Sequence, residues 1–408
     1  MGEGSTGRVR ALVCFSHLRW DFVWQRPQHL LSRFARHVPV LVIEEPIFVE
    51  TDGDGDLQLV ERGNVAVVTP RLPIALESHW GFNAVTNPRI ATLLGPLFTA
   101  RGLSTGNPGV IAWYYTPMAL GVAPAAFTPS LTVFDAMDEL ASFAGAPPEL
   151  RAQEAAVMAA ADLVFAGGPS LYQARQHRHP RVTCFPSGVE PGHFARATRD
   201  QPAPPELSGR DHPLLGFYGV IDERLDLDLV AALADARPAW TLALIGPVVK
   251  IDEADLPRRP NIVYAGKQAY EDLPSFLASF DVAILPFALN EATRFISPTK
   301  TLEYLAGEKP VVSTPVPDVI DLYSRVVEIA ATPDAFIAAV ERLLAESPEH
   351  QARRRTEAAT ILDRSTWDAI AGDMWGLMEE AMASTSQATP AVVDPAHAPD
   401  APVGVAGA

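Results

Sequence analysis

The chain has 408 residues, of which 48% are hydrophobic and 20% are charged, and it carries a formal net charge of −17 at pH 7. This length predicts two domains rather than one core, and so acidic a balance argues against nucleic acid or an anionic membrane as the main partner. Because no run of about 18 apolar residues is present, the sequence predicts no membrane-spanning helix.

The N-terminal residues 1–8 are polar and rich in glycine, so we expect them to be disordered. They lack the apolar core of a signal peptide. The two cysteines, Cys14 and Cys184, each lie inside an apolar, strand-like run. Such thiols are typical of a reducing compartment rather than of a disulfide framework, and we therefore expect a cytoplasmic protein.

Residues 9–195 alternate short β-branched runs with helical segments. Runs that are apolar on both faces and separated by helices predict a parallel sheet covered on both sides, which is a doubly wound, Rossmann-like α/β domain. Strands are expected at residues 9–15, 38–43, 65–69, 110–115, 131–134, 163–165 and 182–185, and helices at residues 27–36, 88–98, 148–160 and 170–176.

Residues 196–213 are polar and proline-rich, which predicts a linker. The alternation resumes over residues 214–364 and predicts a second doubly wound domain. Residues 365–383 predict a further amphipathic helix, and residues 384–408 lack periodicity and are expected to be disordered. In the second half, strands are expected at residues 214–218, 240–245, 262–264, 282–285, 311–313 and 326–329, and helices at residues 225–235, 271–279, 299–306, 332–346 and 350–362.

A long loop, residues 16–27, follows the first strand. Ligands of open α/β sheets bind at the carboxyl ends of the strands, so the cleft between two such domains is the expected site. Ordering large side chains in a loop costs entropy unless they bind something, and His17 is a candidate proton acceptor or partner of sugar hydroxyls. The alternative is that Trp20 and Trp24 only cover the edge of the sheet. The other polar candidates in the loop are Asp21 and Arg26.

Three acidic residues, Asp135, Asp138 and Glu139, follow the strand at residues 131–134. An acid at a strand end that faces the cleft is a candidate general base. The alternative is that Asp135 or Asp138 caps the N-terminus of a helix, and the sequence does not decide between the two.

The segment 297–306 predicts a helix whose N-terminus faces a ligand. Ser297 is a good N-cap and Pro298 suits the first helical position. The free amides and Lys300 in the first turn favour an anion, typically a phosphate. One turn further, the Glu303 carboxylate is a candidate acceptor for ribose hydroxyls. The alternative is an ordinary capped helix between two strands.

Other strand ends of the second domain add to this predicted anion site. Gly219 allows close approach of the backbone, and Arg224 can bind a diphosphate bidentately. Together with Lys267 and Lys300 they predict a diphosphate site that needs no metal. No Cys/His spacing of a metal site is present, and the acidic residues 52–56 are interpreted as a solvated turn.

At this point a family resemblance appears. The chain resembles the GT-B glycosyltransferases, specifically those similar to family 4, also called group 1, over about residues 9–382. The stretches that carry the resemblance are SHLRWDFVWQRPQHLLSR (16–33), VFDAMDEL (133–140), ADLVFAGGPSL (161–171), FPSGVEPGHF (185–194), GFYGVIDERLD (216–226), FDVAILPF (280–287) and SPTKTLEYLAGEKPVVST (297–314).

The resemblance implies a nucleotide-sugar donor held by the second domain and an acceptor held mainly by the first. It implies that the C-terminal helix crosses back onto the first domain, and bacterial members with this opening motif resemble enzymes of exopolysaccharide or cell-envelope synthesis. Many relatives carry two glutamates, of which the second matches Glu303 and the first falls on Phe295. The donor residues that match by position are Arg224, Lys267, Ser297, Thr299, Lys300 and Glu303, and Gly219 joins them as the glycine that allows close approach of the backbone.

We therefore expect a metal-independent glycosyltransferase that uses a UDP- or GDP-sugar and a glycan or lipid-linked acceptor, the latter at the inner face of the membrane. The predicted catalytic bases are, in order, Asp138, Asp21 and His17, and the predicted acceptor residues are Trp20 and Arg26. Two alternatives are a non-catalytic nucleotide-sugar binding subunit and a nucleotide-sugar 2-epimerase.

Overall fold

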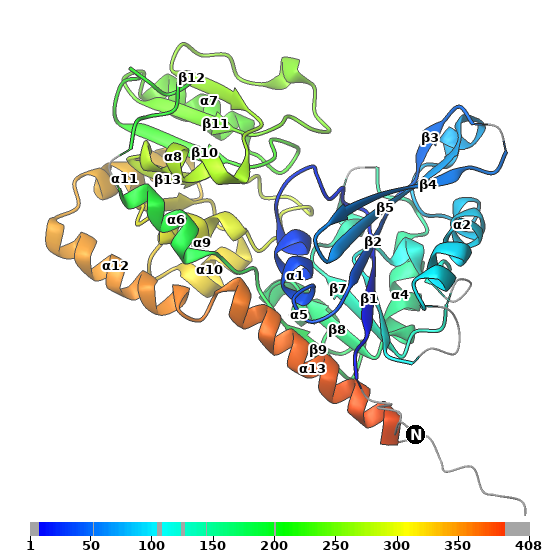
Figure 1. The fold of residues 1–408 in the computed structure, drawn as a ribbon. Coiled ribbons are helices and arrows are strands. Elements are labelled where there is room, and N and C mark those ends of the chain that lie inside the picture. The colour runs from blue at the N-terminus through cyan, green and yellow to red at the C-terminus, as the bar shows by residue number, and fades with distance from the viewer. Residues whose placement is uncertain are drawn as a thin grey trace, which may run out of the picture.

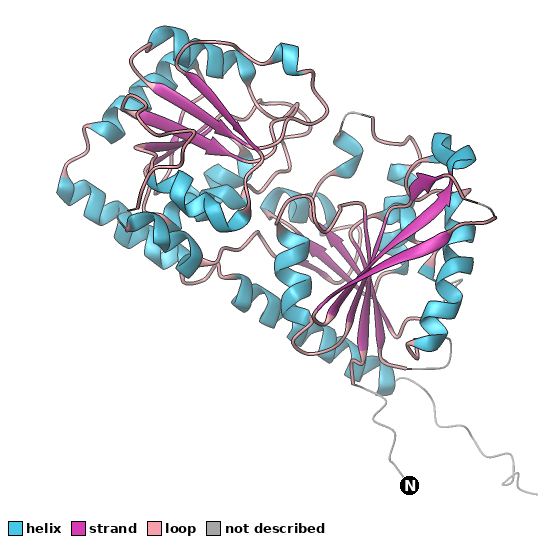
Figure 2. Cartoon of the chain, turned by 45° about the horizontal axis from the view of Figure 1, so that its top comes forward, coloured by secondary structure: helices cyan, strands magenta, loops and turns pink. Residues whose placement is uncertain are grey.

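The computed structural model describes residues 8–51, 53–103, 108–123, 127–143, 145–199 and 201–387. They form two α/β units, each with one sheet flanked by helices, which lie beside one another (Figures 1 and 2). The predicted ends of the chain, residues 1–7 and 388–408, lie outside the described residues.

The first sheet contains nine strands within the described residues, in the order β3-β5-β2-β1-β6-β7-β8-β9, with β4 pairing to β5. All pairs are parallel except β4 with β5. The strands are β1 Ala11–Ser16, β2 Val40–Glu44, β3 Ile47–Val49, β4 Asp56–Arg62, β5 Val65–Pro73, β6 Val110–Tyr114, β7 Leu131–Ala136, β8 Leu163–Ala166 and β9 Val182–Cys184, and the helices are α1 Arg26–Phe34, α2 Thr86–Ala100, α4 Leu150–Ala160 and α5 Pro169–Arg175. The short helix α6 Pro191–Phe194 follows β9 and has Phe194 buried in the core of the second unit.

The second sheet is parallel throughout, in the order β12-β11-β10-β13-β14-β15. Its strands are β10 Leu214–Tyr218, β11 Thr241–Ile245, β12 Ile262–Gly266, β13 Val282–Leu285, β14 Val311–Ser313 and β15 Glu328–Ile329. The helices are α7 Leu227–Ala236, α8 Leu273–Ala278, α9 Thr299–Ala306, α10 Pro317–Tyr323, α11 Pro333–Leu344, α12 Pro348–Leu362 and α13 Trp367–Gln387.

Strand β1 explains why the first sheet is covered on both faces. All six of its residues are buried, and successive side chains of a strand point to opposite faces. Leu12 and Cys14 accordingly belong to one apolar cluster, while Val13 and Phe15 belong to the other. A strand without a polar face requires a helical layer on each side.

Helix α13 crosses back onto the first domain, as the resemblance implied. Figure 1 shows it, in orange and red, running from α12 of the second domain along the first. Its residues Trp367, Met374 and Met378 are buried in the same cluster as Leu12 of β1. The helix continues through Gln387, so the prediction that order ends at residue 383 was wrong.

The chain passes between the domains twice, and the two crossings pair with each other. The Val189 N–H donates to the Ser365 carbonyl at 2.8 Å, and the Trp367 N–H donates to the Val189 carbonyl at 3.1 Å. This short parallel bridge places α6 and the start of α13 side by side. The predicted linker, residues 196–213, is also packed against the second domain more closely than its polar composition indicates, because Ala197 and Leu207 are buried in the second core.

Strands β3 and β4 and helices α6 and α10 were absent from the sequence-based prediction. Strand β3 has only three residues, and β4 is mostly exposed, so neither shows the apolar pattern of a core strand. Helix α10 spans seven residues. In the predicted turn at residues 52–56, Asp54 pairs with Arg89 at 3.1 Å and Asp56 pairs with Arg71 at 3.2 Å. Within the described part of the chain, no helix combines the length and apolar character needed to cross a bilayer.

Candidate active site

A cavity of about 440 Å³ lies where the two domains face each other. The second domain lines it with residues that follow β10, β11 and β12 and with the first turns of α9, and the first domain lines it with residues 20–25. This is the carboxyl edge of the second sheet, where ligands of open α/β sheets bind.

The three predicted phosphate-binding cations, Arg224, Lys267 and Lys300, all line this cavity. The Arg224 guanidinium is held by Asp222, with its Nε 2.9 Å from Oδ1 and its Nη2 2.7 Å from Oδ2. Burial, followed by the nearby charge of Arg224, lowers the pKa of Lys300. Two cations that are partly desolvated and repel each other are strongly stabilised when an anion binds between them.

Two glycines allow the backbone to come close to Lys300. Gly219 follows β10 with φ of 143°, and a Cβ there would collide with the Lys300 side chain. Gly246 follows β11 with φ of 150°, and a Cβ there would collide with the Gly219 carbonyl. Both angles are strained for other residues, so the two strand ends depend on glycine.

Glu303 lies on α9 one turn after Lys300 and lines the same cavity. Burial raises its pKa to about 7, and the charge of Lys300 opposes that rise. The side chain of Tyr218 also lies beside the carboxylate and lowers its pKa. A buried carboxylate next to a lysine is well placed to accept hydrogen bonds from ligand hydroxyls.

The N-terminus of α9 differs in part from the prediction. Thr299 lines the cavity, but the residue at the N-cap position is Pro298, and no side-chain cap forms within the described chain. The buried hydroxyl of Ser297 has no hydrogen-bond partner among the described residues. A Cβ at Gly168 of the first domain would collide with Asp318 and meet Ser297. Ser297 is therefore a residue of the domain contact, and its predicted N-cap role was wrong.

The first-domain loop covers the cavity with aromatic side chains. Trp20 is buried and lines the cavity, and its backbone N–H donates to Oε1 of Glu44, at the end of β2, at 2.6 Å. Trp24 is 41% exposed and Phe22 is 36% exposed, and both line the cavity. The Lys267 ammonium lies 5.2 Å from the centroid of the Phe22 ring, a cation–π contact between the domains.

Arg26 requires a correction, because its position rules out the predicted contact with an acceptor. It is 3% exposed and pairs bidentately with Asp135, at 3.0 Å from Nε to Oδ2 and 2.9 Å from Nη2 to Oδ1. Its Nη1 donates to the Phe185 carbonyl at 2.8 Å. The guanidinium thus joins α1 to β7 and to the segment after β9. Asp135 is the last but one residue of β7 and does not cap a helix.

The three candidate bases occupy different environments. Burial raises the pKa of Asp138 to about 6, with Arg224 of the second domain opposing the rise. Burial, followed by the charge of Lys250, lowers the pKa of His17 to about 4, so His17 is neutral at pH 7. Asp21 lines the cavity, but its side chain is 71% exposed and pairs with Arg62 at 3.1 Å. Of the three, only Asp138 has a pKa that responds to Arg224, and only Asp21 is among the residues that line the cavity.

Residues 212–346 match the family model described as glycosyl transferases group 1. This match shows that the second domain is similar to the group 1 glycosyltransferases. The matched segment contains β10 to α11 and therefore all the second-domain residues of the cavity.

A Bacillus subtilis (strain 168) protein, provisionally named teichuronic acid biosynthesis glycosyltransferase TuaH, is 29% identical to this chain over 188 residues. The match covers 44% of this chain and 47% of the relative, so it spans about half the length of that protein.

Two solved structures show that this chain has the GT-B fold. Sucrose-phosphate synthase from Thermosynechococcus elongatus superposes with a TM-score of 0.66 at 17% identity, covering 92% of this chain and 100% of that chain. A trehalose-6-phosphate protein from E. coli, bound with UDP-2-fluoro glucose, superposes with a TM-score of 0.66 at 14% identity, covering 91% and 99%.

Sequence reasoning missed several residues that line the cavity of this GT-B protein. Gly246 and Pro247 follow β11 just as Gly219 follows β10, so the strand-end rule could have found them. Gln268 and Tyr270 follow Lys267 closely, but they lack a pattern that marks them. The position of Gln268 and Tyr270 in the cavity wall depends on how the second domain contacts the first.

Proposed function

We propose that this protein transfers a sugar from a nucleoside diphosphate sugar to a glycan acceptor in the synthesis of a cell-wall polysaccharide. The observation that supports the proposal most strongly is the convergence of Arg224, Lys267 and Lys300 on one cavity that also contains Glu303. Cations and helix amides suit a diphosphate, and a carboxylate suits ribose hydroxyls. The sugar-nucleotide analogue in the E. coli structure and the name of the Bacillus relative agree with this chemistry.

In the proposed reaction, the bond between the donor sugar and the diphosphate breaks, and negative charge grows on the departing diphosphate. Arg224, Lys267 and Lys300 stabilise that charge in a site with little water, where such interactions are strongest. Three fixed cations supply the charge that a divalent metal would otherwise provide, and this is the basis for proposing metal independence. The acceptor binds on the first-domain side, near Trp24 and Phe22.

Asp138 is the proposed base if the configuration at the transferred carbon is inverted. With a pKa of about 6 the carboxylate is mostly ionised at pH 7 yet still basic enough to accept a proton from an acceptor hydroxyl. A first-domain carboxylate whose pKa responds to Arg224 favours a catalyst over the alternative of a non-catalytic binding subunit. That alternative retains one supporting observation, which is Phe295 at the position where relatives carry their first glutamate.

The test is release of nucleoside diphosphate from UDP- and GDP-sugars, measured with and without glycan and lipid-linked acceptors and with and without EDTA. We expect release from one donor, stimulation by an acceptor, retention of activity in EDTA, and a new glycosidic bond in the product. Binding of a donor without any release would instead support the binding subunit. Conversion of the donor sugar to its 2-epimer would support the epimerase.

A further inference from the structure

Glu190 occupies the point where the chain enters the second domain. It follows Val189, which pairs with the returning chain at Ser365 and Trp367, and it immediately precedes α6. A residue here contacts both domains and lies next to the segment about which they would rotate. None of the roles derived above uses this carboxylate, although it is only partly exposed.

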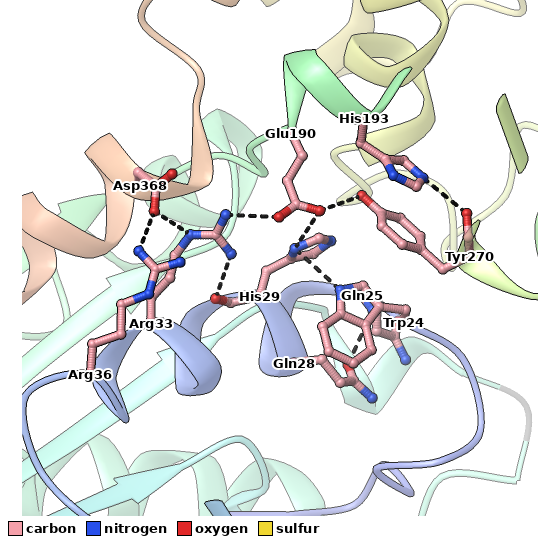
Figure 3. A network of polar contacts seen from close by, with 10 residues as sticks. All are labelled: Trp24, Gln25, Gln28, His29, Arg33, Arg36, Glu190, His193, Tyr270 and Asp368. Carbon is pink, nitrogen blue, oxygen red and sulfur yellow. Dashed lines mark hydrogen bonds and ion pairs between the residues drawn. The ribbon is translucent and has the colours of Figure 1, made fainter. Parts of the chain in front are cut away.

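The two oxygens of Glu190 bind different domains (Figure 3). Oε1 accepts a hydrogen bond from Arg33 of α1, in the first domain, at 3.0 Å. Oε2 accepts from the Tyr270 hydroxyl, in the second domain, at 2.9 Å. Arg33 in turn donates to Asp368 at the start of α13 at 2.9 Å. The network thus joins α1, both chain crossings and the cavity wall.

Tyr270 is the member of this network that reaches the candidate active site. It lines the cavity together with Glu303. Its ring stacks on His193 with centroids 4.3 Å apart and lies 6.1 Å from Trp24 of the first domain. Burial, followed by the charges of Glu303 and Glu190, raises the pKa of Tyr270, so the hydroxyl stays protonated and remains a donor.

The first-domain side of the network is fixed by a neutral histidine. His29 is 1% exposed, and burial, with the charge of Arg33, lowers its pKa to about 2. Its Nδ1 accepts from Trp24 Nε1 at 3.3 Å, and its ring stacks on Trp367 at 4.8 Å. The orientation of Trp24, which lines the cavity, therefore depends on the same contacts that hold α13.

We propose that Glu190 is a positioning residue that holds Tyr270 beside Glu303 and so links the contact between the domains to binding of the donor nucleoside. The inference rests on the proposed function. When the domains separate, Trp24 and His29 leave the Tyr270 ring. When they meet, the Glu190 carboxylate fixes the ring and hydroxyl in the wall of the cavity. Donor binding and contact between the domains then stabilise each other, because the Glu190 side chain takes part in both.

The test compares wild type with Tyr270→Phe, Glu190→Gln and the double variant. Tyr270→Phe removes only the hydroxyl, so it remains informative if the Glu190 variant folds poorly. We expect each single variant to weaken UDP or GDP binding roughly tenfold, as the loss of one charge-assisted hydrogen bond predicts. We expect the double variant to be no weaker than the worse single variant, because residues that act through each other are not additive. Glu346→Gln is the matched control, since it removes a carboxylate from a comparably buried pair with Arg354 outside the cavity lining.

Hydrogen exchange of the ligand-free protein provides a readout that does not depend on nucleotide. Both single variants should increase exchange in residues 266–273 and 20–29, and Glu346→Gln should not. If exchange in these segments is unchanged, or if the losses of affinity multiply in the double variant, the inference is overturned. If wild type binds no nucleotide while exchange responds as expected, the proposed function fails and the claim about donor affinity falls with it, but the coupling across the network stands.

Discussion

Asp138 and Glu303 are two carboxylates with raised pKa values that have different tasks in the proposed reaction. Asp138 comes from the first domain and has a pKa of about 6, and Glu303 comes from the second and has a pKa of about 7. Burial is the main cause of both shifts, and a nearby cation limits each of them. Burial thus keeps one carboxylate basic enough to take a proton, while the other lies where a ribose would need a hydrogen-bond acceptor.

Asp138→Asn separates these tasks. We expect kcat to fall by a factor of about 100 or more with little change in nucleotide affinity, because the amide cannot accept the proton. In wild type, kcat should rise with pH through about 6, as Asp138 loses its proton. Asp21→Asn is the matched comparison, since that carboxylate is exposed and pairs with Arg62. Wild-type turnover by Asp138→Asn would remove this residue from the mechanism.

At the scale of elements, the buried pair of Arg26 and Asp135 holds α1 on the end of β7. Removing one partner of such a pair leaves an uncompensated buried charge, which typically costs roughly 3–5 kcal/mol. Arg26→Ala should therefore lower the free energy of unfolding by about that amount, measured by denaturant titration. Arg62→Ala, which breaks an exposed pair, should cost less than about 1 kcal/mol. A stable Arg26→Ala protein that has lost only acceptor affinity would support the original prediction instead.

A second contact between elements joins α5 of the first domain to α10 of the second. Asp318 Oδ1 accepts from the Ser170 N–H at 2.9 Å. Asp318 Oδ2 and the hydroxyls of Ser170 and Ser297 are buried and have no hydrogen-bond partner in the described part of the chain. Burial raises the pKa of Asp318 to about 6 from an ordinary value of 3.8, because its charged form is poorly solvated.

This contact predicts a pH dependence of stability. Between pH 3.8 and about 6 the folded state holds more protons on Asp318 than the unfolded state does, so stability falls as pH rises through this window and stays low above it. Asp318→Asn removes the effect. Its free energy of unfolding relative to wild type should increase by about 2 kcal/mol between pH 4.5 and pH 7.5. A difference between the two proteins that does not change with pH would contradict the assignment.

The elements also show which features could be predicted from the sequence and which could not. Helix α9 was predicted with the bounds that the structure has, because its apolar spacing and its proline are local signals. The predicted N-cap role of Ser297 was wrong, since its Cβ lies against Gly168 of the first domain, and no local pattern shows a contact between domains. Arg26 was misassigned for the same reason, because its partner is 109 residues away in the chain.

At the scale of the whole molecule, each face of the cavity is built by a different domain. The second-domain face depends on one sheet and one helix, so strand ends predicted Gly219 and Arg224, and the N-terminus of α9 predicted Lys300. The first-domain face, with Phe22 and Trp24, and the position of Tyr270 depend on how the domains meet. That arrangement is set by the paired crossings at Val189 and Ser365 and by α13, whose apolar side is buried in the first domain.

The most direct test of the account is a calorimetric titration of UDP, GDP, ADP and TDP in EDTA, with wild type, Lys300→Ala and the exposed-cation control Arg259→Ala. We predict that one nucleotide binds wild type without metal. Lys300→Ala should bind it roughly ten- to a hundredfold more weakly, since a charge-assisted hydrogen bond is worth about 1.5–3 kcal/mol, and Arg259→Ala should bind it like wild type. If Lys300→Ala binds the nucleotide as tightly as wild type does, or if binding appears only when Mg²⁺ is added, the claim that the cavity binds a diphosphate with its own cations would be contradicted.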